Sequence, residues 1–306
     1  MFNRNKTVNT IGNLLFAYRK EYGLTQQDLV GELSHYSQHF HALNTVTLSR
    51  WETGTTSPSL KKKQLLLHFF YMTGAFQNNS CHEIIQDRYQ KLFEPLAKVF
   101  TKNYQALIGN LPERRNSEHT LYALKDFKHK QDHIEHIIDI ETASNSSDYY
   151  KITPELLEEW SQHPANLCII CERKKQHLGH FIMLKIKNSV AKEIAHNTRS
   201  EFMLKKEDFC EPHENGTYYI HALYGRSPKI AAVLSVHGYK HLFKHLDTTQ
   251  NVLIFSTRTD GVLLTQDYGI KTIAKGEDTH YGFNWHGMLS PIEDILFSDT
   301  VLKLVF

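Results

Sequence analysis

The sequence predicts a multi-domain chain in which an all-α N-terminal domain precedes an α/β domain. Short amphipathic segments with recognisable caps fill residues 11–70, whereas strand-like runs alternating with helical patterns begin near residue 118. The 306 residues are enough to build two separate cores. We therefore expect domains at residues 1–74 and 118–306, joined by a helical connector at residues 75–117.

The first two helices of the N-terminal domain are marked by their end signals. Apolar residues at helical spacing occupy residues 11–18, and Gly23 is a natural C-terminal stop. Thr25 is a good N-cap for the next helix, and Asp28 three residues later predicts a capping box.

A third short helix follows near residue 47. Leu48 and Trp51 lie three residues apart on one face, whereas Thr47 and Arg50 point elsewhere, and Gly54 ends the helix. A train of short helices with polar residues facing outward on one of them is how a helix-turn-helix presents its recognition helix to the major groove.

The motifs Leu24-Thr25-Gln26 and Ser49-Arg50-Trp51-Glu52-x-Gly54, followed by Pro58, resemble the XRE/Cro-repressor family of helix-turn-helix proteins. The resemblance covers residues 11–70 and implies a transcriptional regulator that binds double-stranded DNA, usually as a homodimer. One departure is an insertion within residues 34–44, rich in His and aromatic residues. It is either a longer turn that packs its own aromatic side chains or an added contact to the DNA backbone or a partner subunit.

Six residues of this domain are predicted to contact DNA: Gln26, Thr45, Thr47, Arg50, Lys61 and Lys62. Arg50 can pair with guanine O6 and N7, and Thr45 and Thr47 are the other base-edge candidates. We expect Gln26 to anchor a phosphate and the lysines to add non-specific attraction. Residues 1–70 carry eight Lys and Arg against four Asp and Glu, a basic excess that fits phosphate contact.

The composition predicts a cytoplasmic protein without a membrane segment. No run approaches the roughly 20 apolar residues that span a bilayer. The four cysteines are too few and too scattered for a disulfide framework.

The connector carries an apolar stripe at helical spacing: Ile85, Tyr89, Leu92, Leu96 and Val99. We expect this stripe to be a dimer surface. The alternative, that it packs on the following domain, is equally open.

Beyond the connector, strands and helices alternate. The expected order is a strand at 119–127, helices at 129–143 and 153–160, strands at 167–172, 178–187 and 218–223, a helix at 228–246, a strand at 251–256, a helix at 261–268, a strand at 269–275 and two β-rich pieces in 292–306. This order resembles the GNAT family of N-acetyltransferases. Local likenesses are Leu178-Gly179-His180, the strand 218–223 and the segment Gln266-Asp267-Tyr268-Gly269-Ile270.

The resemblance implies an acyl-CoA site that this chain keeps only in part. The family pattern Arg/Gln-x-x-Gly-x-Gly/Ala, which closes on the pyrophosphate of acetyl-CoA, here reads Arg226-Ser227-Pro228-Lys229-Ile230-Ala231. Arg226 and Lys229 are therefore the cofactor-binding candidates. Thr265 stands where many relatives carry the tyrosine that protonates the thiolate, so no catalytic residue is assigned.

Two functions remain for the C-terminal domain. The first is that it senses a small-molecule effector or mediates assembly and uses no cofactor. The alternative is a DNA-tethered N-acyltransferase that uses acetyl-CoA or another acyl-CoA.

Twenty histidines raise the question of a metal site. His237, His241 and His245 recur every four residues, and His129 and His133 share that spacing. A structural zinc site needs four ligands, often with sulfur, and no such set is evident. We expect solvated helix faces and no metal, with a pH-responsive role as a weaker alternative.

Overall fold

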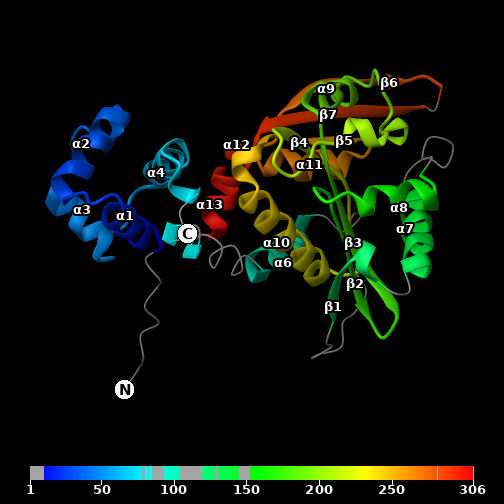
Figure 1. Cartoon of the computed structure of the whole chain (residues 1–306), viewed down its shortest axis with the longest axis horizontal. Helices are drawn as coiled ribbons and strands as arrows, with labels where there is room; N and C mark the ends of the chain where they lie inside the picture. The colour runs from blue at the N-terminus through cyan, green and yellow to red at the C-terminus, as the bar shows by residue number, and fades with distance from the viewer. Residues whose placement is uncertain are drawn as a thin grey trace. The chain divides into compact units, whose positions relative to one another are not determined.

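The computed structural model describes residues 10–77, 80–81, 83–84, 93–103, 119–127, 130–144, 152–280 and 282–305 (Figure 1). The chain forms two compact units, residues 1–91 with 297–306 (unit 1) and residues 92–296 (unit 2). This division differs from the expected boundaries, because the connector is split between the units and the last ten residues group with unit 1. Within the described residues, no helix is long and apolar enough to cross a membrane.

Unit 1 is helical, as the sequence predicts. Its elements are α1 (Thr10–Glu21), α2 (Gln26–Tyr36), η1 (Gln38–Phe40), α3 (Thr45–Glu52), α4 (Leu60–Met72), η2 (Ala75–Gln77) and α13 (Asp299–Val305). The predicted capping box of α2 is present, since Thr25 Oγ1 accepts from the Asp28 N–H and Asp28 accepts from the Thr25 N–H. Asn44 caps α3 by accepting from the Thr47 N–H at 2.8 Å.

The insertion between α2 and α3 packs part of its own sequence into the core. Phe40, in η1, is fully buried and Leu43 is 6 % exposed, whereas His39 and His41 are exposed. This is the arrangement expected of the longer turn that packs its own side chains. His39 and His41 are exposed, and a contact between them and DNA or a partner subunit stays a prediction.

The C-terminal tail is helical, so the expectation of β-rich pieces at 292–306 is wrong. It forms α12 (Ile292–Leu296) and α13, with the Ser298 hydroxyl accepting from the Val301 N–H at 3.3 Å. Phe297 lies with unit 1, where its ring contacts those of His68 and Phe76. A serine cap and the aromatic contacts of Phe297 thus override the β propensity of the local sequence.

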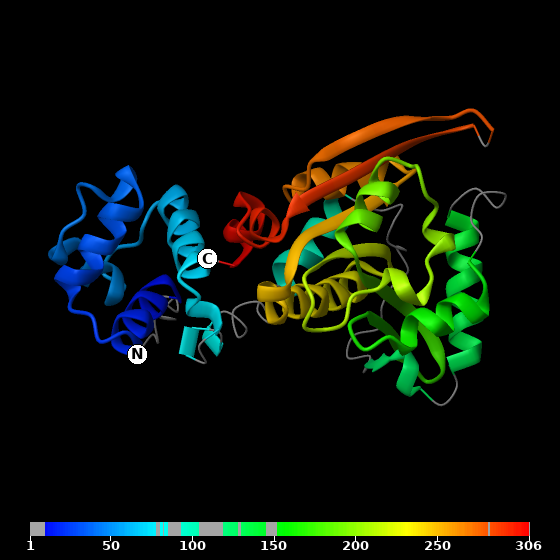
Figure 2. The same ribbon diagram turned by 45° about the horizontal axis from the view of Figure 1, so that its top comes forward.

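Unit 2 is a mixed α/β domain built on a seven-stranded sheet of order β1-β2-β3-β4-β5-β7-β6. Its strands are β1 (Thr120–Ala123), β2 (Leu167–Arg173), β3 (Gln176–Ile186), β4 (Gly216–Gly225), β5 (Thr249–Ser256), β6 (Thr272–Asp278) and β7 (Phe283–Pro291). All neighbouring strands are antiparallel except β4 and β5, which are parallel. The strands β6 and β7 form a long hairpin (Figure 2).

Helices cover both faces of this sheet. The longer helices of unit 2 are α6 (Phe93–Asn103), α7 (Lys130–Ser144), α8 (Pro154–Gln162), α9 (Asn188–Ala195), α10 (Pro228–Lys244) and α11 (Thr259–Asp267). Alternate residues of β3 separate the faces: Ile182 and Leu184 pack in one core with α7, α8 and α9, whereas Phe181 lies against Gly238 of α10. Helix α6 packs alongside α10.

The predicted order of strands and helices from 119 to 275 is confirmed, with two additions. Helix α9 is inserted between β3 and β4, and β7 completes the hairpin with β6. Strand β1 stops at Ala123, where η3 (Leu124–Asp126) begins, and is therefore shorter than expected.

The apolar stripe of the connector is only partly described. Leu96 is 1 % exposed on α6 and Val99 is half-buried, while Ile85, Tyr89 and Leu92 lie outside the residues whose side chains are described. Since Leu96 is buried within unit 2, it is not available as a dimer contact, and the expectation of a dimer surface there is corrected at this position.

Candidate functional site

Strands β4 and β5 pair only at their beginnings. The parallel register runs from Gly216–Thr249 to Tyr219–Leu253 and then stops. Beyond that point the residues of β4 from 220 to 224 and those of β5 from 254 to 256 line a cavity instead of pairing with each other.

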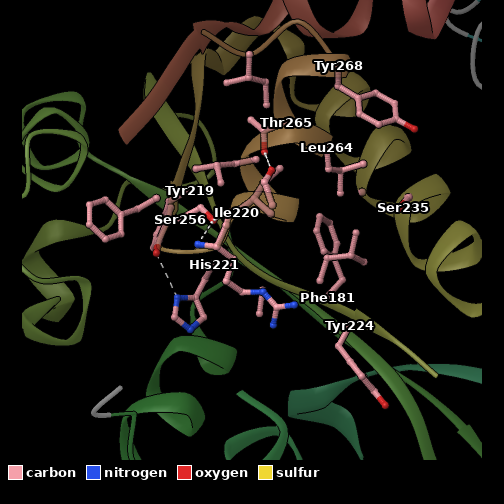
Figure 3. A pocket seen from close by; sticks show the side chains of 18 of the residues that line it. Phe181, Tyr219, Ile220, His221, Tyr224, Ser235, Ser256, Leu264, Thr265 and Tyr268 are labelled. Atoms are coloured by element: carbon pink, nitrogen blue, oxygen red, sulfur yellow. Dashed lines mark hydrogen bonds between the residues drawn. The ribbon is translucent and has the colours of Figure 1, made fainter. Parts of the chain in front are cut away.

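The cavity has a volume of about 210 Å³ and is lined from both faces of the sheet (Figure 3). Ser235, Tyr239 and Leu242 of α10 line it on one side, and Glu141 of α7 lies on the other. Leu96 and Phe100 of α6 complete the wall. The cavity therefore passes through the gap that opens between β4 and β5.

A bulge in β4 shapes this gap. Ile182 pairs with Ala222 and Met183 with Ile220, so His221 is left over in the register. The bulge turns the His221 ring toward the α8 side, where it contacts Trp160 edge-to-face at 5.1 Å. His221 also lies 3.4 Å from the Tyr219 hydroxyl (Figure 3).

Apart from tyrosines, four titratable side chains line the cavity: Glu141, Glu201, His221 and Arg258. Burial lowers the pKa of His221 to about 4, although the nearby Glu141 opposes the shift. His221 is therefore neutral near pH 7. Neutral imidazole and carboxylate are groups that can accept a proton from a bound amine.

The two cofactor-binding candidates lie where β4 enters α10. Arg226 directly precedes the N-cap Ser227, and Lys229 is exposed in the first turn of α10. The backbone donors there are partly committed, since Pro228 has no N–H and the Ile230 N–H points to the Ser227 hydroxyl at 3.4 Å. A phosphate at this helix start would depend more on the two cations than on backbone amides, and their role stays a prediction.

The hydroxyl-bearing residues Thr265 and Tyr268, at the end of α11, also line the cavity. Thr265 donates to the Gly261 carbonyl at 2.7 Å, which commits its proton. Tyr268 lies in the cavity wall about one turn later (Figure 3).

The expectation that the histidines lie on solvated helix faces is wrong for several of them. His241 is 2.9 Å from the Tyr218 hydroxyl, and burial lowers the pKa of His241 to about 3. His133 is 3 % exposed and hydrogen-bonded on both ring nitrogens. Among the described residues, no group of three or more His, Cys, Asp or Glu side chains could hold a metal ion.

The predicted DNA contacts are gathered on α2, α3 and α4 of unit 1. Arg50 is exposed, and Thr45 and Thr47 are half-buried on α3. Lys61 is exposed and Lys62 places its ammonium 5.5 Å from the Trp51 ring. These placements leave the DNA contacts as predictions.

Glu52 of α3 accepts side-chain hydrogen bonds from α1 and α2. Arg19 donates to both carboxylate oxygens of Glu52, at 2.9 and 3.1 Å. Gln26 donates to Glu52 Oε2 at 2.8 Å, so the Gln26 amide would have to share this partner with any phosphate.

Sequence reasoning missed Glu141, Glu201 and His221. Glu141 and His221 are 80 residues apart, and Glu201 lies in η4 (Glu201–Met203) between elements that the sequence did not predict. A signal existed only for His221, as the polar residue inside the apolar strand 218–223.

Fold and site together define unit 2 as an α/β domain whose sheet is opened between its two parallel strands by a cavity. Among solved structures, the chain is similar to FeeM, an N-acyl amino acid synthase from uncultured soil microbes, with 10 % identity, a TM-score of 0.40, and coverage of 57 % of this chain and 91 % of that one. Arabidopsis thaliana NAA60 in complex with acetyl-CoA has 11 % identity, a TM-score of 0.39 and coverage of 57 % and 99 %. An aminoglycoside 6′-acetyltransferase type Ii has 11 % identity, a TM-score of 0.36 and coverage of 57 % and 97 %.

Neither a comparison with protein-family models nor one with curated proteins gives a match. The similarities to solved structures are distant, and the function is argued below from the cavity and its side chains.

Proposed function

We propose that unit 2 binds an acyl thioester in the cavity between β4 and β5 and transfers the acyl group to an amine. The observation that supports this most is that the cavity crosses the sheet, with α10 on one side and Glu141 with His221 on the other. A donor can enter from one face while an acceptor amine approaches from the opposite face. This proposal prefers the acyltransferase alternative over a purely sensing domain.

The main-chain edge of β4 beyond Tyr219 supports the binding of an extended donor. Residues 220–224 of β4 no longer pair with β5. An amide-bearing chain laid along this edge could bond to the main chain as an added strand does. Arg226 and Lys229, at the start of α10, would then be the cations available to the phosphates of acetyl-CoA or another acyl-CoA.

The polar groups distinguish a reacting site from an apolar effector pocket. An amine must lose a proton to attack a thioester carbonyl, and a positioned carboxylate or neutral imidazole accelerates that step. A carboxylate and a neutral imidazole in the wall, Glu141 and His221, fit an amine acceptor better than an apolar effector.

Thioester binding and turnover test the proposal directly. Acetyl-CoA and longer acyl-CoA thioesters should raise the melting temperature of the full chain, because a ligand of the native state stabilises it by mass action. They should also be consumed with primary amines, measured as thiol release. Arg226→Glu combined with Lys229→Glu should weaken binding.

Lys244→Glu with Lys240→Glu is the matched control, because these lysines carry the same charges toward the other end of α10. It should leave thioester binding unchanged. If no acyl-CoA shifts the melting temperature and none is consumed, the acyl-transfer proposal is wrong.

A second candidate function is sequence-specific DNA binding by unit 1, as in a transcriptional regulator. The observation that favours it is the Asn44-capped helix α3, whose buried face carries Leu48 and Trp51 while Arg50 is exposed. We propose that α3 reads the major groove of double-stranded DNA, that two copies bind two-fold operators, and that an effector in unit 2 can bias this binding.

Arg50→Ala should relax sequence preference and cost about 1–3 kcal/mol of operator binding, because a bidentate contact to a guanine edge is lost. Lys61→Ala should instead weaken all DNA sequences alike and reduce the salt slope by about one. Both are measured by fluorescence anisotropy against a selected operator and a scrambled duplex. Unchanged selectivity in Arg50→Ala would remove Arg50 as a base contact.

A further inference from the structure

Three histidines of unit 2 form a continuous hydrogen-bonded chain between two carboxylates. Glu172 Oε2 lies 3.2 Å from His133 Nε2, and His133 Nδ1 lies 3.0 Å from His177 Nδ1. His177 Nε2 lies 3.0 Å from His180 Nδ1, and His180 Nε2 lies 2.8 Å from Glu141 Oε1. We call these five residues the histidine chain.

A bulge brings the two strand members of the chain to one face. His177 and His180 are three residues apart on β3, which would put them on opposite faces of a regular strand. The register shifts between Cys171 and Glu172, so that Cys171 pairs with Gly179 and Glu172 with His177. The extra residue in β3 restores a common face, and both rings point toward α7.

The number of protons in the chain follows from its hydrogen bonds. Four contacts link five groups, and the carboxylates at both ends can only accept when they are ionised. Three neutral imidazoles supply three N–H donors, which is one fewer than the four contacts require. The histidine chain as built therefore holds one proton beyond its neutral imidazoles.

That extra proton belongs near an end of the chain. His133 and His180 each face a carboxylate, whereas His177 lies between two imidazoles. Burial, followed by its His180, His133 and His136 neighbours, lowers the pKa of His177 to about 2. His177 is thus the neutral link, donating to one neighbour and accepting from the other.

The two ends of the chain differ in their surroundings. Glu141 lines the cavity between β4 and β5. Glu172 closes β2 beside the hairpin turn and accepts from the Lys175 N–H at 2.8 Å. The side chains of these glutamates are 13 % and 12 % exposed, whereas His180 between them is fully buried.

We propose that the histidine chain is a proton path that carries the proton released by the acceptor amine from Glu141 in the cavity to Glu172 beside the turn between β2 and β3. The proposal rests on the acyl transfer proposed above and assigns its base. Glu141 is the group that would contact the amine, and His133, His177 and His180 act through it.

The transfer balances without a further reactant. The amine nitrogen forms a bond to the thioester carbonyl carbon, the carbon–sulfur bond breaks, and the sulfur leaves as a thiolate that solvent protonates. The amine proton passes to Glu141. The protons between His180 and Glu172 then each shift across one hydrogen bond, and the one that reaches Glu172 leaves to solvent. A half-turn of each imidazole frees the His180 nitrogen that faces Glu141 to take up the proton of Glu141, so that Glu141 is ionised and the chain again holds one extra proton.

Other titratable groups border the chain and enter its pH dependence. His136 of α7 stacks on His177 at 6.1 Å, and Tyr224 of β4 stacks on His180 at 5.6 Å. His221 of β4 interacts electrostatically with both Glu141 and His180. None of the three provides one of the four bonds in the chain.

Histidine-selective ¹⁵N NMR of the full-length protein tests the proton count without any substrate. We expect His177 to stay neutral from pH 5 to 9 and a proton to be detected in each of the four hydrogen bonds of the chain. A charged His177, or fewer than four hydrogen-bonded protons, would overturn the proposal.

Turnover tests whether the path is used. His177→Gln can donate to one neighbour and accept from the other but cannot pass a proton. It should keep the wild-type melting temperature and thioester affinity, lower kcat on the order of 10²-fold and change the pH profile. Small buffer bases such as imidazole should restore part of the rate.

His136→Gln is the matched control, since it removes an imidazole stacked on His177 without breaking the chain. A kcat and pH profile that change equally in both variants would reduce His177 to a packing role and overturn the proposed path. If the wild-type protein binds and consumes no thioester, the acyl-transfer proposal is wrong, and the proton path that rests on it is wrong as well. If the wild-type protein turns over thioester and His177→Gln has the same kcat and pH profile, only the proton path is wrong.

Discussion

Replacing Glu52 by alanine should destabilise unit 1 by about 3–5 kcal/mol, the cost of removing one partner of a buried ion pair. The pair is well enclosed, with side-chain exposures of 13 % for Arg19 and 6 % for Glu52. Two hydrogen bonds from Arg19 and one from Gln26 end on the same carboxylate. The variant would leave the Arg19 guanidinium without its bidentate partner across α1 and α3.

Hydrogen exchange followed by mass spectrometry measures this effect in unit 1 alone, through peptides from α1, α2 and α3 of the intact chain. Glu32→Ala is the control, because it removes the same charge from α2 but only a 3.4 Å contact from the Tyr18 hydroxyl. Glu32→Ala should change protection little. Equal protection in the two variants would show that the Arg19–Glu52 pair does not hold the helices together.

Replacing Gly287 by alanine should destabilise unit 2 by at least the 1–3 kcal/mol typical of overpacking. An added Cβ on Gly287 would lie 1.7 Å from the carbonyl oxygen of Ala195, the last residue of α9. Because the obstacle is backbone, α9 must move away from β7. Urea unfolding followed by the circular dichroism of the chain measures the loss.

Replacing Gly31 by alanine should have the opposite effect on stability. Nothing lies within 4 Å of the Cβ that would be added there, in the middle of α2. It should stabilise unit 1 by roughly 1 kcal/mol, because alanine is the better helix former. A Gly287→Ala protein as stable as the wild type would mean that α9 adjusts freely on the sheet.

Local signals in the sequence predicted most of the fold. The Thr25 capping box, the strands expected at 167–172 and 178–187 and the helix expected from residue 228 each depend on a few neighbouring residues, and each is found where expected. Elements without such signals were missed, as with α9. The tail was misassigned because the cap at Ser298 and the contacts of Phe297 outweigh the local propensity.

The candidate site could not be predicted to the same extent, because bulges decide which way its side chains point. Without its bulge, β3 would place His177 and His180 on opposite faces. Without its own bulge, β4 would pair His221 with a residue of β3. Glu141 joins them only through the packing of α7 on β3. The periodicities of regular strands and helices therefore do not predict that these residues come together.

The return of residues 297–306 to unit 1 makes unit 2 an insertion between two segments of one folded body. Unit 1 is therefore discontinuous in the chain: Phe76 comes before the whole of unit 2 in synthesis, and the Phe297 ring it contacts comes after it. The helical core of unit 1 can close fully only once unit 2 has been made. Unit 2 is correspondingly held at both ends, so any change in the spacing of its two termini pulls on unit 1 through two covalent connections rather than one.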